Sequence, residues 1–281
     1  MTASVISRAA PGSKYGLWAV VTGASEGIGK AFAESLAQAG FNLVVAARRQ
    51  DVLAAVAKNL SSRHGVEVRP VTCDLGGPEG VALLEDATKE LNAGLLVAAA
   101  GFGTSGPFLN SDLNAELEMI DVNCRAVTAL AHAFGNRFLR RGGGAVVLLS
   151  SLVAFQGVPR AANYAATKAY VQTFAEGLRQ ELSGSGVDVL AVAPGPVRTG
   201  FGQRANMQMS MAQTPGEVAR GALRALGTKG TVRPGFLAQF LELSLKPLPR
   251  WGRVRVMGLV MGGMTKHQQP MTQSYKSATS K

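Results

Sequence analysis

Residues 16–29 read GLWAVVTGASEGIG, in which an apolar run of strand length leads into a glycine-rich turn. Glycine permits a tight turn and a close approach to a pyrophosphate, and the N-terminus of the following helix offers free N–H groups. A glycine-rich turn is often only a turn, but this one follows the first strand of an alternating pattern. We therefore expect dinucleotide binding by the turn residues Gly23, Ser25, Gly27, Ile28 and Gly29.

Apolar runs of strand length alternate with helical patterns along the chain. Runs that are apolar throughout are typical of strands buried on both faces, and their alternation with helices indicates a parallel, doubly wound sheet. The sequence therefore predicts an α/β fold of three layers. The expected strands are 16–22, 41–47, 66–72, 94–100, 144–150 and 187–193, and the expected helices are 27–39, 50–62, 79–91, 112–140 and 162–183.

A further helix begins at Thr214, whose side chain can cap it. Pro215 suits the first helical position and Glu217 completes a capping box. We expect this helix to run to about Leu226. The stretch 195–213 before it is rich in Gly, Met and polar residues and is typical of a loop that closes over a site.

Composition excludes several classes of protein. The 281 residues are 47% hydrophobic and 17% charged, which excludes a disordered chain and favours one large domain. Cys73 and Cys124 cannot form a disulfide scaffold and fit a reducing compartment. The three histidines show no metal-ligand spacing, so no metal site is expected. No signal peptide or membrane-spanning stretch is evident, and we expect a cytoplasmic protein.

The net charge of +11 lies in one part of the chain. Residues 1–197 hold 16 basic and 16 acidic residues, whereas residues 198–281 hold 13 basic and 2 acidic ones. Apolar residues interleave with basic ones near Lys246, Arg250 and Arg255, a pattern that suits an anionic membrane or an acidic partner. A solvated basic face, or arginine packing at a subunit contact, is the favoured explanation. No nucleic-acid-binding motif accompanies the charge, so nucleic acid is not expected.

The ends of the second and third strands point to the cofactor. Arg48 and Arg49 follow the second strand, where an arginine suits the 2′-phosphate of NADP and a carboxylate would suit NAD. Asp74 and Leu75 follow the third strand. A carboxylate there can accept a hydrogen bond from the adenine amino group, or it can cap the next helix.

Ser151, Tyr164 and Lys168 form a candidate catalytic group. Tyr164 and Lys168 are four residues apart, which places them on one face of a helix. A nearby ammonium should lower the pKa of the phenol, which could then exchange a proton with a carbonyl or alcohol oxygen. Ser151 could hold the same oxygen. Such a Tyr–Lys pair taken alone is usually structural.

Taken together, these motifs resemble the short-chain dehydrogenase/reductase family over residues 14–232. The matching motifs are TGASEGIG at 22–29, Asp74, Asn123, Ser151, the Y-x-x-x-K pair Tyr164 and Lys168, and PGPVRT at 194–199. The resemblance implies a Rossmann-type domain and hydride transfer with a nicotinamide cofactor.

The resemblance also implies individual roles. Lys168 would hold the nicotinamide ribose and Asn123 would anchor a water in a proton relay. Val197 and Thr199 would bind the carboxamide, and Ala100 would line the cofactor site. Ser25, Arg48 and Arg49 would surround the 2′-phosphate.

The chain departs from the family pattern in three places. Ala98 and Ala99 replace two asparagines, and Glu26 stands where many NADP-specific members place a basic residue. Residues 233–267 form an additional C-terminal segment, expected to pack on the domain or at an interface. Residues 268–281 are polar, and we expect a disordered tail.

The substrate side is expected to be apolar. Aromatic and methionine side chains suit a bulky apolar carbonyl compound, although they could simply pack a loop onto the core. The residues expected there are Phe102, Val153, Phe155, Gln156, Pro159, Phe201, Met207, Met209 and Met211.

The sequence thus favours an NADPH-dependent carbonyl reductase acting on apolar ketones or aldehydes. A 3-oxoacyl-thioester reductase is the alternative enzyme, and its acidic carrier protein would meet the basic C-terminal segment. A cofactor-binding regulatory protein without turnover is the alternative of another class.

We also expect a homodimer or a homotetramer, because the family pairs two long helices across subunits. The helices 112–140 and 162–183 carry apolar stripes for such a contact, at Leu130, Phe134, Phe138, Tyr170, Val171, Phe174 and Leu178. The C-terminal segment would either close a second interface or cap the entrance of the active site.

Overall fold

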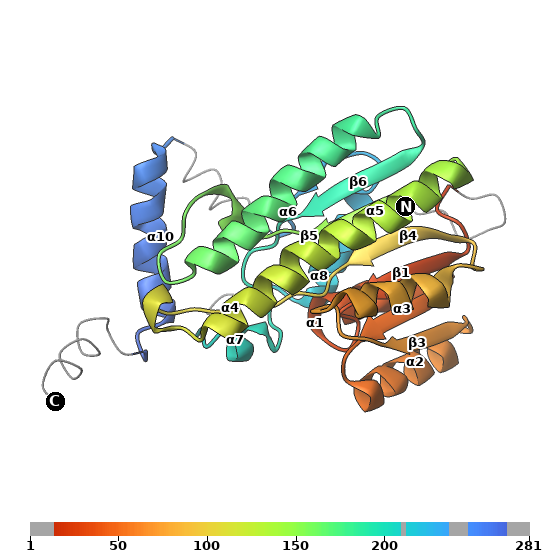
Figure 1. Cartoon of the computed structure of the whole chain (residues 1–281), viewed down its shortest axis with the longest axis horizontal. Helices are drawn as coiled ribbons and strands as arrows, with labels where there is room; N and C mark the ends of the chain where they lie inside the picture. The colour runs from red at the N-terminus through yellow and green to blue at the C-terminus, as the bar shows by residue number, and fades with distance from the viewer. Residues whose placement is uncertain (1–13, 209–211, 236–246, 269–281) are drawn as a thin grey trace, which may run out of the picture.

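A computed structural model describes residues 14–208, 212–235 and 247–268. Its centre is one parallel sheet of seven strands in the order β3-β2-β1-β4-β5-β6-β7 (Figure 1). The predicted doubly wound α/β fold is confirmed. The strands are β1 Trp18–Thr22, β2 Asn42–Ala47, β3 Val68–Thr72, β4 Ala93–Ala98, β5 Gly144–Leu149, β6 Val187–Val192 and β7 Thr231–Val232.

Helices cover both faces of the sheet, as Figure 1 shows. One face packs against α1 (Gly27–Gln38), α2 (Gln50–His64) and α8 (Pro215–Ala225). The other packs against α3 (Pro78–Thr88), α5 (Ala126–Arg141) and α6 (Ala162–Glu181). The remaining elements are η1 Phe108–Asn110, α4 Leu113–Ile120, η2 Asp121–Arg125, η3 Leu152–Phe155, α7 Phe201–Arg204 and α10 Arg250–Met264.

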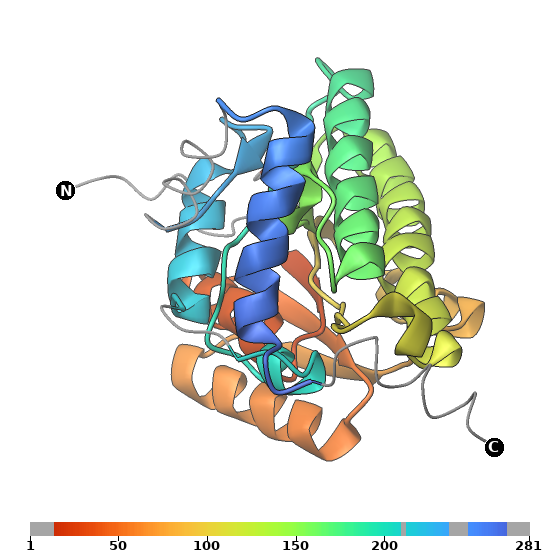
Figure 2. The ribbon, with the colours of Figure 1, turned by 90° about the vertical axis from the view of Figure 1, so that its left-hand side faces the viewer.

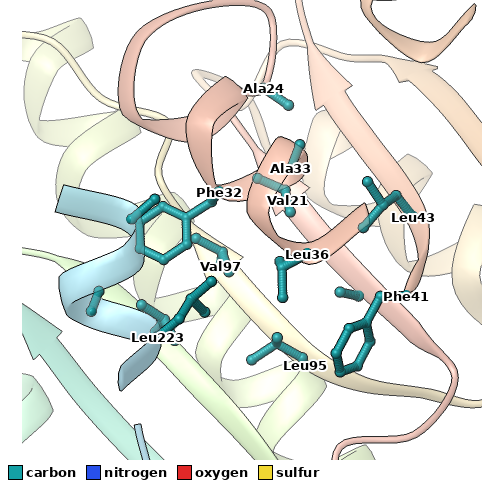
Figure 3. Close-up of a cluster of buried hydrophobic side chains, with 14 of the residues drawn as sticks. Val21, Ala24, Phe32, Ala33, Leu36, Phe41, Leu43, Leu95, Val97 and Leu223 are labelled. Carbon is teal, nitrogen blue, oxygen red and sulfur yellow. The ribbon is translucent and has the colours of Figure 1, made fainter. Parts of the chain in front are cut away.

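The apolar strands divide their side chains between two cores. Val21 and Val97 face the first core and Val20 faces the second, since successive side chains of a strand point to opposite faces. Figure 3 shows the first core, where Phe32 of α1 and Leu223 of α8 lie close to Val97. Burial on both faces explains why these strands carry almost no polar residues.

The predicted helix 112–140 is interrupted. It consists of α4, the π-helical turn η2 and α5, which follow one another without a loop. A π-helical turn adds a residue to the helical repeat and is frequent at functional sites. The turn buries Val122 and Asn123, so it sets the orientation of Asn123. A periodic apolar pattern cannot reveal such a local change of phase.

The helix predicted from Thr214 is confirmed. The Thr214 hydroxyl accepts a hydrogen bond from the Glu217 N–H at 3.3 Å, and the Glu217 carboxylate accepts one from the Thr214 N–H at 2.8 Å. Helix α8 packs beside α1 on the same face of the sheet. The short edge strand β7 was not predicted, because two residues make no recognisable apolar run.

Most side chains proposed for a subunit contact belong to the core of the chain itself. Leu130, Phe134, Phe138 and Val171 are buried against the sheet, which corrects that part of the sequence interpretation. Tyr170 remains exposed. Exposed apolar side chains gather instead on η1 and α4, at Phe108, Leu109, Leu113, Leu117 and Ile120. Within the described residues, no helix has both the length and the apolar character to cross a membrane.

All seven strands are parallel, so their carboxyl ends lie at one edge of the sheet, and this edge positions the site. The order of the strands reverses between β1 and β4, and in open α/β sheets ligands bind outside the carboxyl ends of the strands at such a point. Helix α10 lies across this end of the sheet, at the left of Figure 1 and in front in Figure 2.

Candidate active site

The glycine-rich turn follows β1 with a backbone that only glycine suits. Gly23 and Gly27 adopt φ values of +66° and +58°, in the region that side chains disfavour. A Cβ at Gly29 would lie 2.3 Å from the carbonyl oxygen of Gly23. Glu26 precedes α1 without capping it through its side chain, so the first N–H groups of the helix remain available to an anion.

Two arginines lie beside this turn at the end of β2. Arg49 donates a hydrogen bond to the Ser25 hydroxyl at 3.2 Å and pairs with the Glu26 carboxylate at 2.8 Å. Arg48 pairs with Glu118 of α4 at 2.9 Å. All of these residues except Glu118 line one cavity, together with Gly23, Gly27, Ile28 and Gly29. Two guanidiniums at a helix N-terminus make a site for a phosphate group.

Asp74 lies in the same cavity, next to Leu75. Its carboxylate accepts a hydrogen bond from the Gly76 N–H at 2.9 Å, and its side chain is largely exposed. The helix that follows begins after Gly77, so Asp74 does not cap it. Of the two sequence interpretations, the capping role is wrong and the adenine role stays a prediction.

Tyr164 and Lys168 project from the first turns of α6 into the cavity. The Lys168 ammonium donates a hydrogen bond to the Leu149 carbonyl at 2.9 Å and lies 5.9 Å from the centre of the Tyr164 ring. Ser151 follows β5 and is hydrogen-bonded to Tyr164. A serine, a phenol and an ammonium thus meet at the end of the central strands.

Burial is the main influence on the pKa values of Tyr164 and Lys168. It raises the pKa of Tyr164 to about 12, against a smaller lowering by the hydrogen bond from Ser151. It lowers the pKa of Lys168 to about 8. The sequence interpretation expects a lowered pKa for the phenol, whereas in this state of the site burial outweighs any lowering and the pKa is raised. The phenol stays protonated at neutral pH, as a general acid must be.

Asn123 lies behind the cavity and does not line it. Its amide nitrogen donates to the Phe102 carbonyl at 2.9 Å and to the Thr167 hydroxyl at 3.0 Å, and its amide oxygen accepts from the Phe102 N–H at 3.2 Å. A Cβ at Gly101 would lie 2.8 Å from that oxygen and 3.4 Å from the Lys168 nitrogen. Glycine at this position therefore allows the loop after β4 to pass beside both groups.

That loop also carries the departure from the family pattern. Ala98 is buried in the sheet, while Ala99 and Ala100 line the cavity. The Ala100 N–H donates to the Thr22 hydroxyl at 3.1 Å, which ties the loop to β1. On the opposite side, Val197 and Thr199 line the cavity after β6. The Thr199 hydroxyl accepts from the Phe201 N–H at 3.2 Å.

The cavity has a volume of about 630 Å³ and continues past Tyr164 into an apolar chamber. Phe102, Val153, Phe201 and Met207 line it as predicted. The Tyr164 and Phe201 rings lie 5.3 Å apart. The opposite wall comes from α10, through Val256, Met257, Val260, Met261 and Met264. No motif marks these residues in the sequence, although their spacing of three or four is helical.

Three predicted substrate residues, Phe155, Gln156 and Pro159, do not line the cavity. Phe155 packs against Arg233, whose guanidinium carbon lies 4.3 Å from the ring centre, and Gln156 is buried with its amide directed to the Leu152 carbonyl. The cause is the tight turn η3, which rotates successive side chains away from the direction of Val153. Pro159 packs close to Gly258 of α10. Met209 and Met211 lie outside the described residues.

The sequence also gave no sign of Arg204, which lines the cavity. Its guanidinium carbon lies 3.6 Å from the centre of the Phe102 ring, and it pairs with Glu118 at 3.5 Å. Burial lowers the pKa of this guanidinium. Glu118 therefore pairs with both Arg204 and Arg48, two side chains that line the cavity.

Comparison with known proteins agrees with this geometry. The family profile described as short chain dehydrogenase matches residues 17–210. The chain belongs to this family, whose active members are oxidoreductases that act on hydroxyl and carbonyl groups.

Individual relatives carry more specific descriptions. A 7beta-hydroxysteroid dehydrogenase of Clostridium sardiniense is 32% identical over 80% of this chain and 87% of its own length. A very-long-chain 3-oxoacyl-CoA reductase-B of Danio rerio is 35% identical over 66% of this chain and 61% of its own length. A short-chain dehydrogenase from Sphingobium yanoikuyae, solved in complex with NADPH, is 32% identical with a TM-score of 0.74, over 82% of this chain and 93% of its own.

Proposed function

We propose that this protein reduces a bulky apolar ketone or aldehyde with NADPH. The observation that carries the proposal is the continuous cavity, which has Ser151, Tyr164 and Lys168 on one side and the apolar wall of α10 on the other. Apart from the catalytic hydroxyls and the guanidinium of Arg204, which stacks on Phe102, the chamber is lined mostly by apolar side chains. A carbonyl on a large apolar skeleton fits such a chamber.

The side chains perform the proton half of the reduction. NADPH, when bound, supplies the hydride for the carbonyl carbon. The Ser151 hydroxyl holds the carbonyl oxygen, and the Tyr164 phenol donates its proton to that oxygen as negative charge develops there. Lys168, still mostly cationic at neutral pH with a pKa of about 8, stabilises the phenolate that remains.

Selection of NADPH over NADH rests on Arg48, Arg49 and Ser25. Their guanidiniums and hydroxyl converge beside the glycine turn, where a 2′-phosphate would replace the carboxylates of Glu26 and Glu118 as their partner. Charge-assisted hydrogen bonds to phosphate are about twice as strong as neutral ones. The NADPH complex of the Sphingobium yanoikuyae relative supports this assignment.

A 3-oxoacyl-thioester reductase is the second candidate, supported by the resemblance to the Danio rerio reductase. The apolar chamber would then hold an acyl chain. A cofactor-binding protein without turnover is the third candidate, and the geometry of Asn123, Ser151, Tyr164 and Lys168 argues against it. A binding role alone does not require that arrangement.

The experiment is the consumption of NADPH by the purified protein with three groups of substrates. They are polycyclic ketones, shorter aldehydes and ketones, and 3-oxoacyl-coenzyme A thioesters. We expect the highest kcat/KM with polycyclic ketones and no comparable rate with NADH. Faster turnover of thioesters would favour the second candidate. No turnover in any group, with NADPH binding intact, would leave the third.

A further inference from the structure

Helix α10 has one face in the cavity and another toward solvent. Met257 and Met261 of the inner face are buried, whereas Trp251 is 66% and Leu259 is 80% exposed. Trp251, Arg255 and Leu259 are spaced by four residues and share one side of the helix. These three residues form what we call the outer face of α10. Arg255 lies above Trp251, with 5.5 Å between its guanidinium carbon and the ring centre.

The charge around this face has a single sign. Residues 247–268 contain Arg250, Arg253, Arg255 and Lys266 and no Asp or Glu. Arg250 and Arg255 are exposed. Because residues 198–281 carry the whole net charge of +11, the outer face adjoins the most basic part of the chain.

The outer face borders the mouth of the cavity. Val260 lines the cavity and is also 42% exposed, so it lies at the rim. Val256, one turn earlier, lines the same side. A path along α10, from Leu259 past Val260, therefore leads from the surface of the protein into the chamber.

The domain holds α10 in this orientation. Gly258 passes close to Pro159, since a Cβ at Gly258 would lie 3.3 Å from the Pro159 ring. Beyond the helix, Gln268 donates hydrogen bonds to the Ser105 hydroxyl at 2.9 Å and to the Asn206 carbonyl at 2.8 Å. The outer face is thus presented to solvent by a helix fixed at its end.

We propose that the outer face of α10 docks the protein on an anionic phospholipid bilayer, with the mouth of the cavity next to the lipid. Tryptophan suits the membrane interface, arginine attracts anionic headgroups, and an exposed leucine gains by entering the acyl boundary. The face combines an exposed tryptophan, an exposed leucine and basic residues on one helix, a combination that suits an anionic lipid surface. Delivery of an apolar substrate from the lipid additionally rests on the proposed function.

Vesicle flotation of the full-length protein tests the docking without NADPH or substrate. We expect binding to vesicles of phosphatidylcholine and phosphatidylglycerol, and little binding to phosphatidylcholine alone. The emission of Trp251 should shift to shorter wavelength on binding. Trp18, the only other tryptophan, is 7% exposed in the core and gives a constant background.

A matched pair of variants separates docking from general attraction by net charge. Arg255→Glu with Leu259→Ser should weaken binding to anionic vesicles at least about tenfold. Lys58→Glu with Leu83→Ser makes the same two changes at exposed positions of α2 and α3 and should bind like the wild type. Thermal unfolding of both variants checks that they fold.

Several results would overturn the proposal, whatever the outcome of the turnover assays. They are an absence of binding to anionic vesicles, equal weakening in both double variants, or an unchanged Trp251 emission. Loss of an oligomer in the α10 variant, measured by light scattering, would identify a second copy of the chain as the occupant. Binding to an acidic carrier protein without binding to vesicles would identify a protein partner.

Discussion

The guanidinium of Arg160 donates a hydrogen bond of 2.5 Å to the hydroxyl of Thr265, and so joins the start of α6 to the end of α10. Arg160 has a φ of +66°, in the left-handed region that a residue with a side chain seldom adopts. Its carbonyl accepts a hydrogen bond from the Gly106 N–H at 2.7 Å. Tyr164 lies four residues after Arg160, so this contact fixes the distance between the Tyr164 phenol and the apolar wall of α10.

Thr265→Val should therefore weaken substrate binding more than chemistry. The variant removes the side-chain acceptor of Arg160 at a residue that is 1% exposed and leaves the Thr265 carbonyl, 3.3 Å from the guanidinium. The stability should fall by about 1 kcal/mol. We expect a higher KM for the apolar carbonyl substrate with kcat almost unchanged. Thr265→Ser keeps the hydroxyl and serves as the control. Equal KM values in the two variants would contradict the role of this contact.

Tyr164→Phe should reduce kcat at least about 100-fold, because general acid catalysis contributes that much or more. The ring still packs against Phe201, so NADPH binding should be retained. Single-turnover rates and NADPH titration measure the two properties separately. A variant that reduces the substrate at nearly the normal rate would exclude Tyr164 as the proton donor.

Arg48→Asp should shift the cofactor preference toward NADH. Hydrogen bonds to charged groups contribute ~1.5–3 kcal/mol, so kcat/KM for NADPH should fall at least about tenfold. The aspartate can accept hydrogen bonds from the ribose hydroxyls of NADH. The ratio of kcat/KM for the two cofactors is the measurement. A wild-type enzyme that already prefers NADH would show that the end of β2 has been misassigned.

Burial of Lys168 makes a prediction about stability and pH. Its pKa is about 8 in the folded chain and 10.5 ordinarily, so the folded state binds fewer protons than the unfolded state between these values. The free energy of unfolding should then rise with pH in this window. Each pKa unit corresponds to ~1.4 kcal/mol.

Chemical denaturation of the wild type and of Lys168→Met at pH 7 and pH 9.5 measures this effect. Between pH 7 and pH 9.5, the free energy of unfolding of the wild type should rise by about 2 kcal/mol more than that of Lys168→Met. Tyr164 keeps its proton at pH 9.5, with a pKa of about 12, and so disturbs the comparison little. A difference that does not change with pH would mean that the ammonium is not desolvated.

The assembly is predicted to be at least a homodimer. The exposed apolar side chains Leu109, Leu113 and Leu117 lie close together in sequence on η1 and α4 and favour a contact between like surfaces. Light scattering at micromolar concentration should give a multiple of 29.2 kDa. Leu113→Arg with Leu117→Arg should release monomers. A monomeric wild type would reject the assembly.

The parts of the molecule that the sequence predicted are those where chemistry requires a short, fixed spacing. The glycines at 23, 27 and 29 and the pair Tyr164 and Lys168 lie within single turns, and the structure places them as the motifs imply. The central strands β1, β2, β4, β5 and β6 followed from burial on both faces, which excludes most polar residues, whereas the edge strand β3 is exposed.

The unpredicted parts depend on packing between distant segments. Arg204 reaches Phe102 across about one hundred residues, and Met261 reaches the cavity from outside the sheet. No local pattern encodes either contact. The direction of Phe155 depends on one tight turn, and the pKa of Tyr164 depends on how completely its neighbours exclude water.

Helix α10 supplies one wall of the chamber from a single contiguous segment that lies outside the seven-stranded sheet. If the proposed function holds, the side chains for proton transfer and the side chains that contact the substrate come from separate segments of the chain. Grafting residues 247–268 from a relative with another substrate would exchange the preference while the acid, its lysine and the cofactor cradle stay untouched. The same modularity lets mutation diversify what the enzyme accepts without retuning how it reacts.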